Sequence, residues 1–148
     1  MNQFKIEKAR SEQMPEVAKV FKASRLESLP YLPNLHSEEE DIFFFSNVVF
    51  QDHEIYVAIE DQNIIGFIAF NSEWIDHLYL LPRVQNKGVG SQLLNIALKN
   101  STCLKLWTFQ KNQSAQKFYE KHGFIELKRT DGTENEEKEP DILMEWRK

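Results

Sequence analysis

Residues 74–100 constrain the fold most, because the spacing of their apolar residues changes along the segment. Residues 74–81 are largely apolar and predict a strand, which Pro82 ends because proline cannot donate to a sheet ladder. Further on, apolar residues recur at every fourth position, at Val89, Leu93 and Ala97. This spacing predicts an amphipathic helix that ends near Asn100. A strand followed by such a helix predicts layers of sheet and helix.

Similar patterns predict the elements of the remaining chain. Strands are expected at residues 4–9, 54–60, 64–70, 103–109, 124–129 and 142–146. Helices are expected at residues 11–29, 37–49 and 112–122, with a capping-box spacing at Ser37 and Glu40. The order β-α-α-β-β-β-α-β-α-β-β predicts an α/β (α+β mixed) fold, with one central mixed β-sheet and helices on both faces. A single domain spanning residues 1–148 is expected.

The composition is that of a globular protein, with 41% hydrophobic and 28% charged residues. The formal net charge of −5 disfavours nucleic acid as a partner, because phosphate binding needs a basic face. This charge suits a cationic partner, or solubility alone.

The single cysteine, Cys103, cannot form an internal disulfide, and we interpret it as a core residue. Without a membrane-spanning stretch or a signal-peptide pattern, a cytoplasmic location and no membrane partner are expected.

The loop before the helix at Val89 contains two glycines, Gly88 and Gly90. Glycines let a ligand approach the backbone, and a helix N-terminus offers unpaired N–H groups to an anion, so the loop suits a phosphate. The Walker pattern fails because Lys87 precedes Gly88, and the dinucleotide fingerprint fails because Leu93 stands where a third glycine is needed. Taken alone, the two glycines are explained better by an ordinary glycine-rich turn than by a phosphate site.

Two blocks of sequence resemble the GCN5-related N-acetyltransferase (GNAT) family. Residues 85–90 (QNKGVG) are similar to its Q/R-x-x-G-x-G/A signature, with Asn86 where many members have glycine. Residues 112–124 (NQSAQKFYEKHGF) are similar to its N-x-x-A-x-x-F-Y-x-x-x-G-F segment at all six specified positions. The resemblance implies the family's fold and the transfer of an acetyl group from acetyl-coenzyme A to an amine, with no metal.

The resemblance also implies where coenzyme A would bind. Backbone N–H groups of the loop would hold its pyrophosphate, at Gln85, Asn86, Lys87, Gly88, Val89, Gly90 and Ser91. The strands at 74–81 and 103–109 would splay apart, and pantetheine would pair with the backbone of Leu78, Tyr79 and Leu80. Asn112 would contact the coenzyme, cap its own helix, or do both.

One residue is a candidate for the catalytic acid, and three are candidates for the base. The resemblance implies that Tyr119 donates a proton or hydrogen bond to the departing thiolate, although packing alone would also explain it. Asp76 and His77 are candidates for the base that deprotonates the amine. Period-two geometry predicts that they point to opposite faces, so that only one reaches the pocket. Glu73 is a third option, and the proton could also leave through water.

Two segments are candidates for the acceptor site. The loop at 29–36 commonly walls the acceptor pocket in the family, which singles out Tyr31 and His36. The acidic loop at 131–141 could attract a cationic amine through Glu136, Glu137 and Asp141, or could simply be solvated.

A small-molecule or peptide amine is the expected partner. Many relatives are dimers, so a homodimer is an expectation. The alternative function is a noncatalytic acetyl-coenzyme A sensor or interaction module.

Overall fold

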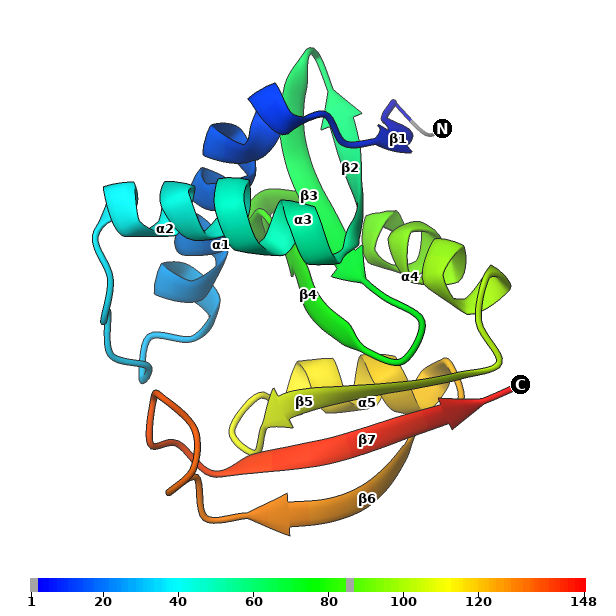
Figure 1. Cartoon of the computed structure of the whole chain (residues 1–148). Coiled ribbons are helices and arrows are strands. Elements are labelled where there is room, and N and C mark those ends of the chain that lie inside the picture. The colour runs from blue at the N-terminus through cyan, green and yellow to red at the C-terminus, as the bar shows by residue number, and fades with distance from the viewer. Residues whose placement is uncertain (1–2, 85–86) are drawn as a thin grey trace.

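The computed structural model describes residues 3–84 and 87–148 and contains two antiparallel sheets (Figure 1). The first has the order β1-β2-β3-β4, formed by β1 (Lys5–Lys8), β2 (Glu54–Glu60), β3 (Asn63–Phe70) and β4 (Ile75–Leu80). The second has the order β5-β7-β6, formed by β5 (Cys103–Phe109), β7 (Asp141–Arg147) and β6 (Ile125–Thr130). The predicted mixed α+β class is confirmed, although its strands are divided between two sheets.

The helices lie near their predicted positions. A short 3₁₀ turn, η1 (Ser11–Gln13), leads into α1 (Met14–Ser28), and a later one, η3 (Pro82–Val84), follows β4. The second predicted helix comprises α2 (Glu38–Phe44), a π-helical segment η2 (Phe45–Val49) and α3 (Phe50–Asp52). Its capping box forms as predicted, because Glu40 N–H donates to Ser37 Oγ and Ser37 N–H donates to Glu40 Oε1. The remaining helices are α4 (Val89–Lys99) and α5 (Gln113–Lys121).

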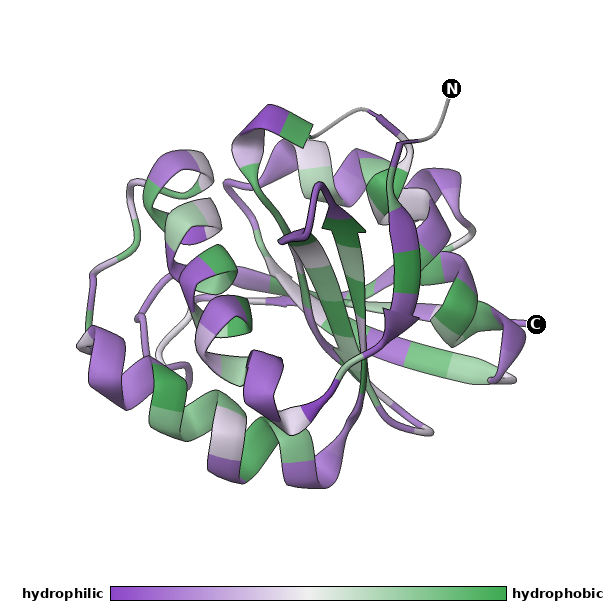
Figure 2. Ribbon diagram, turned by 90° about the horizontal axis from the view of Figure 1, so that it is seen from above, coloured by the Kyte–Doolittle hydropathy of each residue, from purple (hydrophilic) through white to green (hydrophobic). Residues whose placement is uncertain are grey.

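Hydrophobic residues fill both faces of the first sheet, as the green strands of Figure 2 illustrate. Alternate residues of β3 face opposite ways, so Ile68 packs toward α4 while Phe67 packs toward α1 and η2. Around Phe67 the buried cluster includes Met14, Val17, Phe45 and Val57. Around Ile68 it includes Leu93, Leu94, Leu104 and Ile142. The helices therefore cover both faces, as predicted. None of the helices in the described part of the chain has the length and hydrophobicity needed to cross a bilayer.

The two sheets meet where β4 and β5 begin and separate beyond that point (Figure 1). Trp74 and Lys105 form a single parallel bridge, and Lys105 N–H donates to the carbonyl oxygen of Glu73 over 2.9 Å. Within the described residues no further bridge joins the two strands. The edge of β4 therefore stays open along most of its length, and it borders a gap between the sheets.

Candidate functional site

A β-bulge interrupts the pairing of β4 with β3 at Asp76. Ala69 pairs with His77, and the next residue, Phe70, pairs with Ile75, so Asp76 has no partner in the ladder. Such a bulge redirects side chains locally. As a result, Asp76 and His77 both line one cavity. The sequence-based prediction that these side chains point to opposite faces is therefore wrong, because it assumed an uninterrupted strand.

The cavity has a volume of about 740 Å³ and lies beside the gap between the sheets. Its walls come from α1, the α1–α2 loop, α2, β4, β5 and the β6–β7 loop. It is lined by Tyr79 of β4 and by Trp107 and Phe109 of β5, so it borders both strands that flank the gap. A ligand in the gap and a ligand in the cavity would therefore meet at β4.

His77 lies in an aromatic box at the cavity wall. The ring centroids of Phe45, Phe21 and Phe44 lie 5.3, 5.9 and 5.9 Å from that of His77. Burial among these rings lowers the pKa of His77 to about 4, against the opposing attraction of Asp76. The imidazole is therefore neutral near pH 7. Its Nδ1 atom is buried and has no hydrogen-bond partner within the described residues.

His53 holds Asp76 in place from the end of α3. Its Nε2 atom lies 2.6 Å from Asp76 Oδ2, and its Nδ1 atom lies 3.1 Å from the carbonyl oxygen of Val49. The two contacts fix the orientation of the His53 ring and hold the Asp76 side chain at the cavity wall. No sequence pattern singles out His53, because it is adjacent to Asp76 only in the folded chain.

The open edge of β4 presents alternate backbone groups to the gap. Leu81 N–H donates to Ile65 O over 2.9 Å, and antiparallel pairing alternates, so the amide of Tyr79 also faces β3. The amides of Leu78 and Leu80 consequently face the gap. Of the three residues expected to pair with pantetheine, only these two present backbone groups to it. Tyr79 contributes its side chain to the cavity instead.

The N-terminus of α4 has no side-chain cap. Gly88 occupies the cap position with φ 84°, and a Cβ added there would meet nothing within 4 Å. The first hydrogen bond of the helix runs from Gln92 N–H to Gly88 O, so the amides of Val89, Gly90 and Ser91 precede it. The described part of the loop thus offers amides to an anion. Gln85 and Asn86, also expected to bind the coenzyme, lie outside the described residues.

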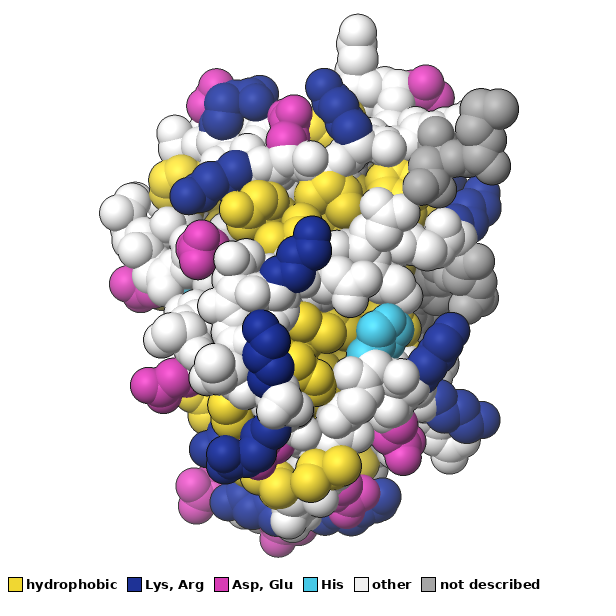
Figure 3. All heavy atoms as spheres, turned by 90° about the vertical axis from the view of Figure 1, so that its right-hand side faces the viewer, with side chains coloured by type: hydrophobic (Ala, Val, Ile, Leu, Met, Phe, Trp, Pro, Cys, Tyr) yellow, Lys and Arg dark blue, Asp and Glu magenta, His cyan; other side chains and the backbone are white. Residues whose placement is uncertain are grey.

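The charge on this side of the molecule also suits an anion. Figure 3 shows the side on which α4 lies, with Lys and Arg side chains across its middle beside a hydrophobic strip. Asp and Glu side chains lie mostly near its margins. Lys87 is exposed at the start of α4. Lys87 thus places a positive charge beside the amides that begin α4, which favours a phosphorylated ligand.

Tyr119 and Asn112 both lie on α5 or at its start. The Tyr119 side chain is buried against Phe124, with ring centroids 5.4 Å apart. Burial raises the pKa of Tyr119 well above its usual value, and the neighbouring Tyr79 raises it further. The phenol therefore stays protonated at physiological pH. Asn112 caps the helix, since its Oδ1 atom accepts a hydrogen bond from Ala115 N–H over 3.2 Å.

The candidate acceptor residues divide into two groups. His36, Glu136 and Glu137 line the cavity, whereas Tyr31 and Asp141 do not belong to its lining. Asp141 is buried and accepts hydrogen bonds from Thr130 and Asn135, so it fixes the base of its own loop. Tyr31 is covered by Lys111, whose ammonium lies 5.2 Å from the ring centroid. Each carboxylate oxygen of Asp141 thus accepts a hydrogen bond at the base of its own loop, and neither belongs to the cavity proposed for the amine.

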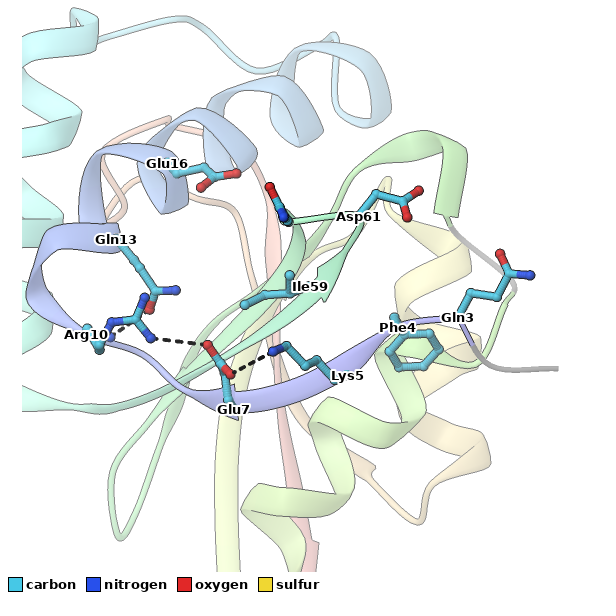
Figure 4. A pocket seen from close by; sticks show the side chains of 10 residues that line it. Gln3, Phe4, Lys5, Glu7, Arg10, Gln13, Glu16, Ile59 and Asp61 are labelled. Atoms are coloured by element: carbon cyan, nitrogen blue, oxygen red, sulfur yellow. Dashed lines mark hydrogen bonds and ion pairs between the residues drawn. The ribbon is translucent and has the colours of Figure 1, made fainter.

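A second pocket, of about 720 Å³, lies at the outer edge of the first sheet (Figure 4). It is bordered by β1, η1 and the β2–β3 turn and shares no lining residue with the cavity beside β4. Glu7 is in ion pairs with Lys5 and Arg10, over 3.6 and 3.3 Å. Both cations that line this pocket are therefore paired with Glu7, and the pocket lies at the β1 edge of the sheet, opposite the β4 edge that borders the gap.

Comparison with known proteins agrees with this geometry. Residues 51–126 match the family model of the acetyltransferase (GNAT) domain. The peptidyl-lysine N-acetyltransferase YjaB of Salmonella typhimurium is 34% identical over 71 residues, which are 47% of this chain and 49% of the relative. YafP of Escherichia coli, named an N-acetyltransferase, is 32% identical over 75 residues, 51% of this chain and 48% of YafP. The chain thus spans about half the length of the curated relatives it matches.

Solved structures share the whole fold. The PaiA N-acetyltransferase of Thermoplasma acidophilum, in complex with coenzyme A, has a TM-score of 0.77 and 24% identity, with 100% of both chains covered. The yncA structure from Salmonella typhimurium, with acetyl-coenzyme A, has a TM-score of 0.76 and 13% identity, covering 99% of this chain and 94% of yncA. The matched family model covers half of the chain, including β4, α4 and α5. The chain therefore belongs to the GNAT acetyltransferase family.

Proposed function

We propose that this protein transfers the acetyl group of acetyl-coenzyme A to a primary amine, and that residues 1–148 act as one catalytic domain. The observation that carries the proposal is the position of β4, which borders both the gap between the sheets and the cavity. A coenzyme in the gap and an amine in the cavity would be held side by side, which is what a direct transfer requires. The structures of PaiA with coenzyme A and of yncA with acetyl-coenzyme A support the choice of coenzyme.

The residues present fit coenzyme A as the ligand of the gap. Its diphosphate would bind the uncapped amides of α4, where the space beside Gly88 is open. Its pantetheine arm would pair with the backbone of Leu78 and Leu80 at the free edge of β4, as an added strand does. The coenzyme supplies a thioester, whose carbonyl oxygen gains negative charge when an amine attacks. A free N–H on β4 would stabilise that charge.

Tyr119 is suited to assist the departing thiolate. Because its pKa is raised, the phenol keeps its proton at the pH at which the amine reacts. A neutral phenol can donate a hydrogen bond or a proton to sulfur. Its burial against the core also limits the orientations of the ring. We assign Tyr119 as the general acid of the reaction.

Asp76 and His77 are suited to bind the amine at the other side of the reacting centre. The neutral His77 imidazole can accept a hydrogen bond from the amine, and Asp76 provides a carboxylate beside it. A pKa near 4 makes His77 a weak base, so we assign it to orient the amine. The amine proton would pass to Asp76 or to water in the cavity.

Replacing Tyr119 tests the proposal. Tyr119→Phe is expected to lower kcat at least about a hundredfold, the lower limit of general acid catalysis, because only the hydroxyl is lost. Coenzyme release with a panel of primary amines would be followed through its free thiol, and coenzyme affinity by calorimetry. Tyr56→Phe is the matched control, since Tyr56 stacks on Phe70 and does not line the cavity.

Two outcomes would contradict the proposal. Equal kcat in Tyr119→Phe and the wild type would remove Tyr119 from the mechanism. Tight coenzyme binding without thiol release for any amine would favour the alternative function, a noncatalytic sensor of acetyl-coenzyme A.

A further inference from the structure

The apolar part of the cavity is large and mainly aromatic. Three groups of side chains form it: Phe43 and Phe44 from α2, Trp107 and Phe109 from β5, and Phe21 from α1. Phe43, Trp107 and Phe44 are 65%, 44% and 39% exposed, and a cluster of exposed apolar side chains marks a ligand or partner site. Leucines of the α1–α2 connection extend the surface. These side chains can bury a flat or bulky apolar group of a ligand. A linear polycation has no such group.

Carboxylates outnumber fixed cations in the same cavity. Six line it, against one lysine and one arginine, and both cations are paired: Lys22 lies 2.8 Å from Asp41, and Arg25 lies 2.9 Å from Glu137. Of the other four carboxylates, Glu40 and Glu136 contact His36 and Asp76 contacts His53, so the lining keeps an excess of acidic over permanently charged basic side chains, which favours a ligand with a positive charge. A second feature is the neutral imidazole of His77, which lines the cavity and carries one ring nitrogen that can accept a hydrogen bond. The cavity therefore combines aromatic surface with groups that bind an ammonium or amine.

Two ion pairs connect opposite walls of the cavity. Glu137 of the β6–β7 loop binds Arg25 of α1, and these side chains are only 19% and 18% exposed. Glu136 of the same loop binds His36 of the α1–α2 loop, and this bond raises the pKa of His36 so that its charge persists to higher pH. Both pairs join segments far apart in the sequence. A polypeptide lying across this side of the cavity would have to break them.

We propose that the acceptor is a small primary amine with an apolar body of about the size of one aromatic ring. The inference rests on the proposed function and names its substrate class. The aromatic side chains would cover the body, and Asp76 and His77 would hold the nitrogen toward β4. A volume of about 740 Å³ is in the range that encloses small ligands, about 300–1,000 Å³. In the reaction the C–N bond forms as the C–S bond breaks, and the proton lost by nitrogen balances the proton gained by sulfur.

A comparison of three acceptors tests the substrate class. Thiol release would be measured with 2-phenylethylamine, spermidine and a short peptide containing one lysine, all with saturating acetyl-coenzyme A. The expected kcat/KM for 2-phenylethylamine is at least about tenfold above both others. A higher kcat/KM for spermidine or the peptide would overturn the substrate class while leaving acetyl transfer intact. If no amine releases thiol, the proposed function itself fails.

A pair of exposed residues provides the matched variants. Phe43→Ala removes an aromatic ring from the cavity, whereas Ile125→Ala removes a side chain of similar exposure, 62%, on β6 outside it. Phe43→Ala is expected to lower kcat/KM about tenfold for 2-phenylethylamine and less than twofold for methylamine, which has no aryl body. Ile125→Ala should change neither. Calorimetric binding of 2-phenylethylamine with coenzyme A present should weaken in parallel. Equal losses for both amines in Phe43→Ala would overturn the inference.

Discussion

At the scale of single residues, His77 couples the site to the stability of the fold. Its pKa is about 4 in the folded chain and about 6.5 when unfolded, so the unfolded chain binds the proton more tightly between these values. The stability from neutral His77 is complete above pH 6.5 and is lost as the pH falls toward 4. From pH 7 to 4.5 this loss is about 2 kcal/mol. The His77→Leu variant has no titratable side chain at this position. Its free energy of unfolding, measured with urea at both pH values, should therefore fall by about 2 kcal/mol less than that of the wild type. An identical pH dependence in both proteins would contradict this account.

The residues that could be predicted from the sequence are those whose role follows from the local chain. Asn112 precedes an apolar helical pattern, and it caps α5. His53 and Arg25 could not be predicted, because their contacts with Asp76 and Glu137 cross 23 and 112 residues of chain. Tyr119 is intermediate: its position on α5 follows from the pattern, but its part in catalysis stays a prediction. Long-range pairing, rather than residue type, decides which polar side chains meet at the cavity.

At the scale of elements, a Cβ would have different effects at the two glycines of α4, Gly88 just before the helix and Gly90 within it. Gly88 has φ 84°, and a residue with a Cβ pays about 1–2 kcal/mol in that conformation, so Gly88→Ala should lower the free energy of unfolding by about 1 kcal/mol. Gly90 is helical, and its added Cβ would lie 3.4 Å from Leu80 and Phe118, an ordinary contact. Gly90→Ala is the matched control and should leave the free energy of unfolding unchanged or raise it by up to about 1 kcal/mol, because alanine is the better helix former. Equal losses in urea unfolding would refute the distinction.

Most element positions followed from periodicity, but the bulge in β4 did not. The predicted strand at 74–81 was correct in place, and its apolar pattern fits either a regular or a bulged strand. The bulge depends on how Phe70 and Ala69 of β3 align with Ile75 and His77, which is a property of the pair of strands. That alignment turns Asp76 into the cavity. A similar reason explains the π-helical segment η2, whose extra residue per turn leaves no mark in the sequence pattern.

At the scale of the whole molecule, the division into two sheets gives the proposed coenzyme a structural role. Within the part of the chain that the structure describes, a single bridge, between Trp74 and Lys105, joins the start of β4 to β5, and the edge of β4 beyond it can pair with a ligand. A coenzyme bound only to the folded state stabilises it by about 2.7 kcal/mol at a hundred times its Kd. For a chain of this length that corresponds to a rise in Tm of about 5–10 °C. The rise should appear with both acetyl-coenzyme A and free coenzyme A.

Hydrogen exchange distinguishes binding in the gap from binding elsewhere. The amide of Tyr79 faces β3 and is protected in the free protein, whereas the amides of Leu78 and Leu80 face the gap and exchange faster. If pantetheine adds to the edge of β4, acetyl-coenzyme A will slow exchange at Leu78 or Leu80 and leave Tyr79 nearly unchanged. Residue-resolved exchange by NMR measures all three amides together. A rise in Tm without slower exchange at either leucine would show that the coenzyme binds away from β4. It would then contradict the proposal that the acetyl group and the amine meet at this strand.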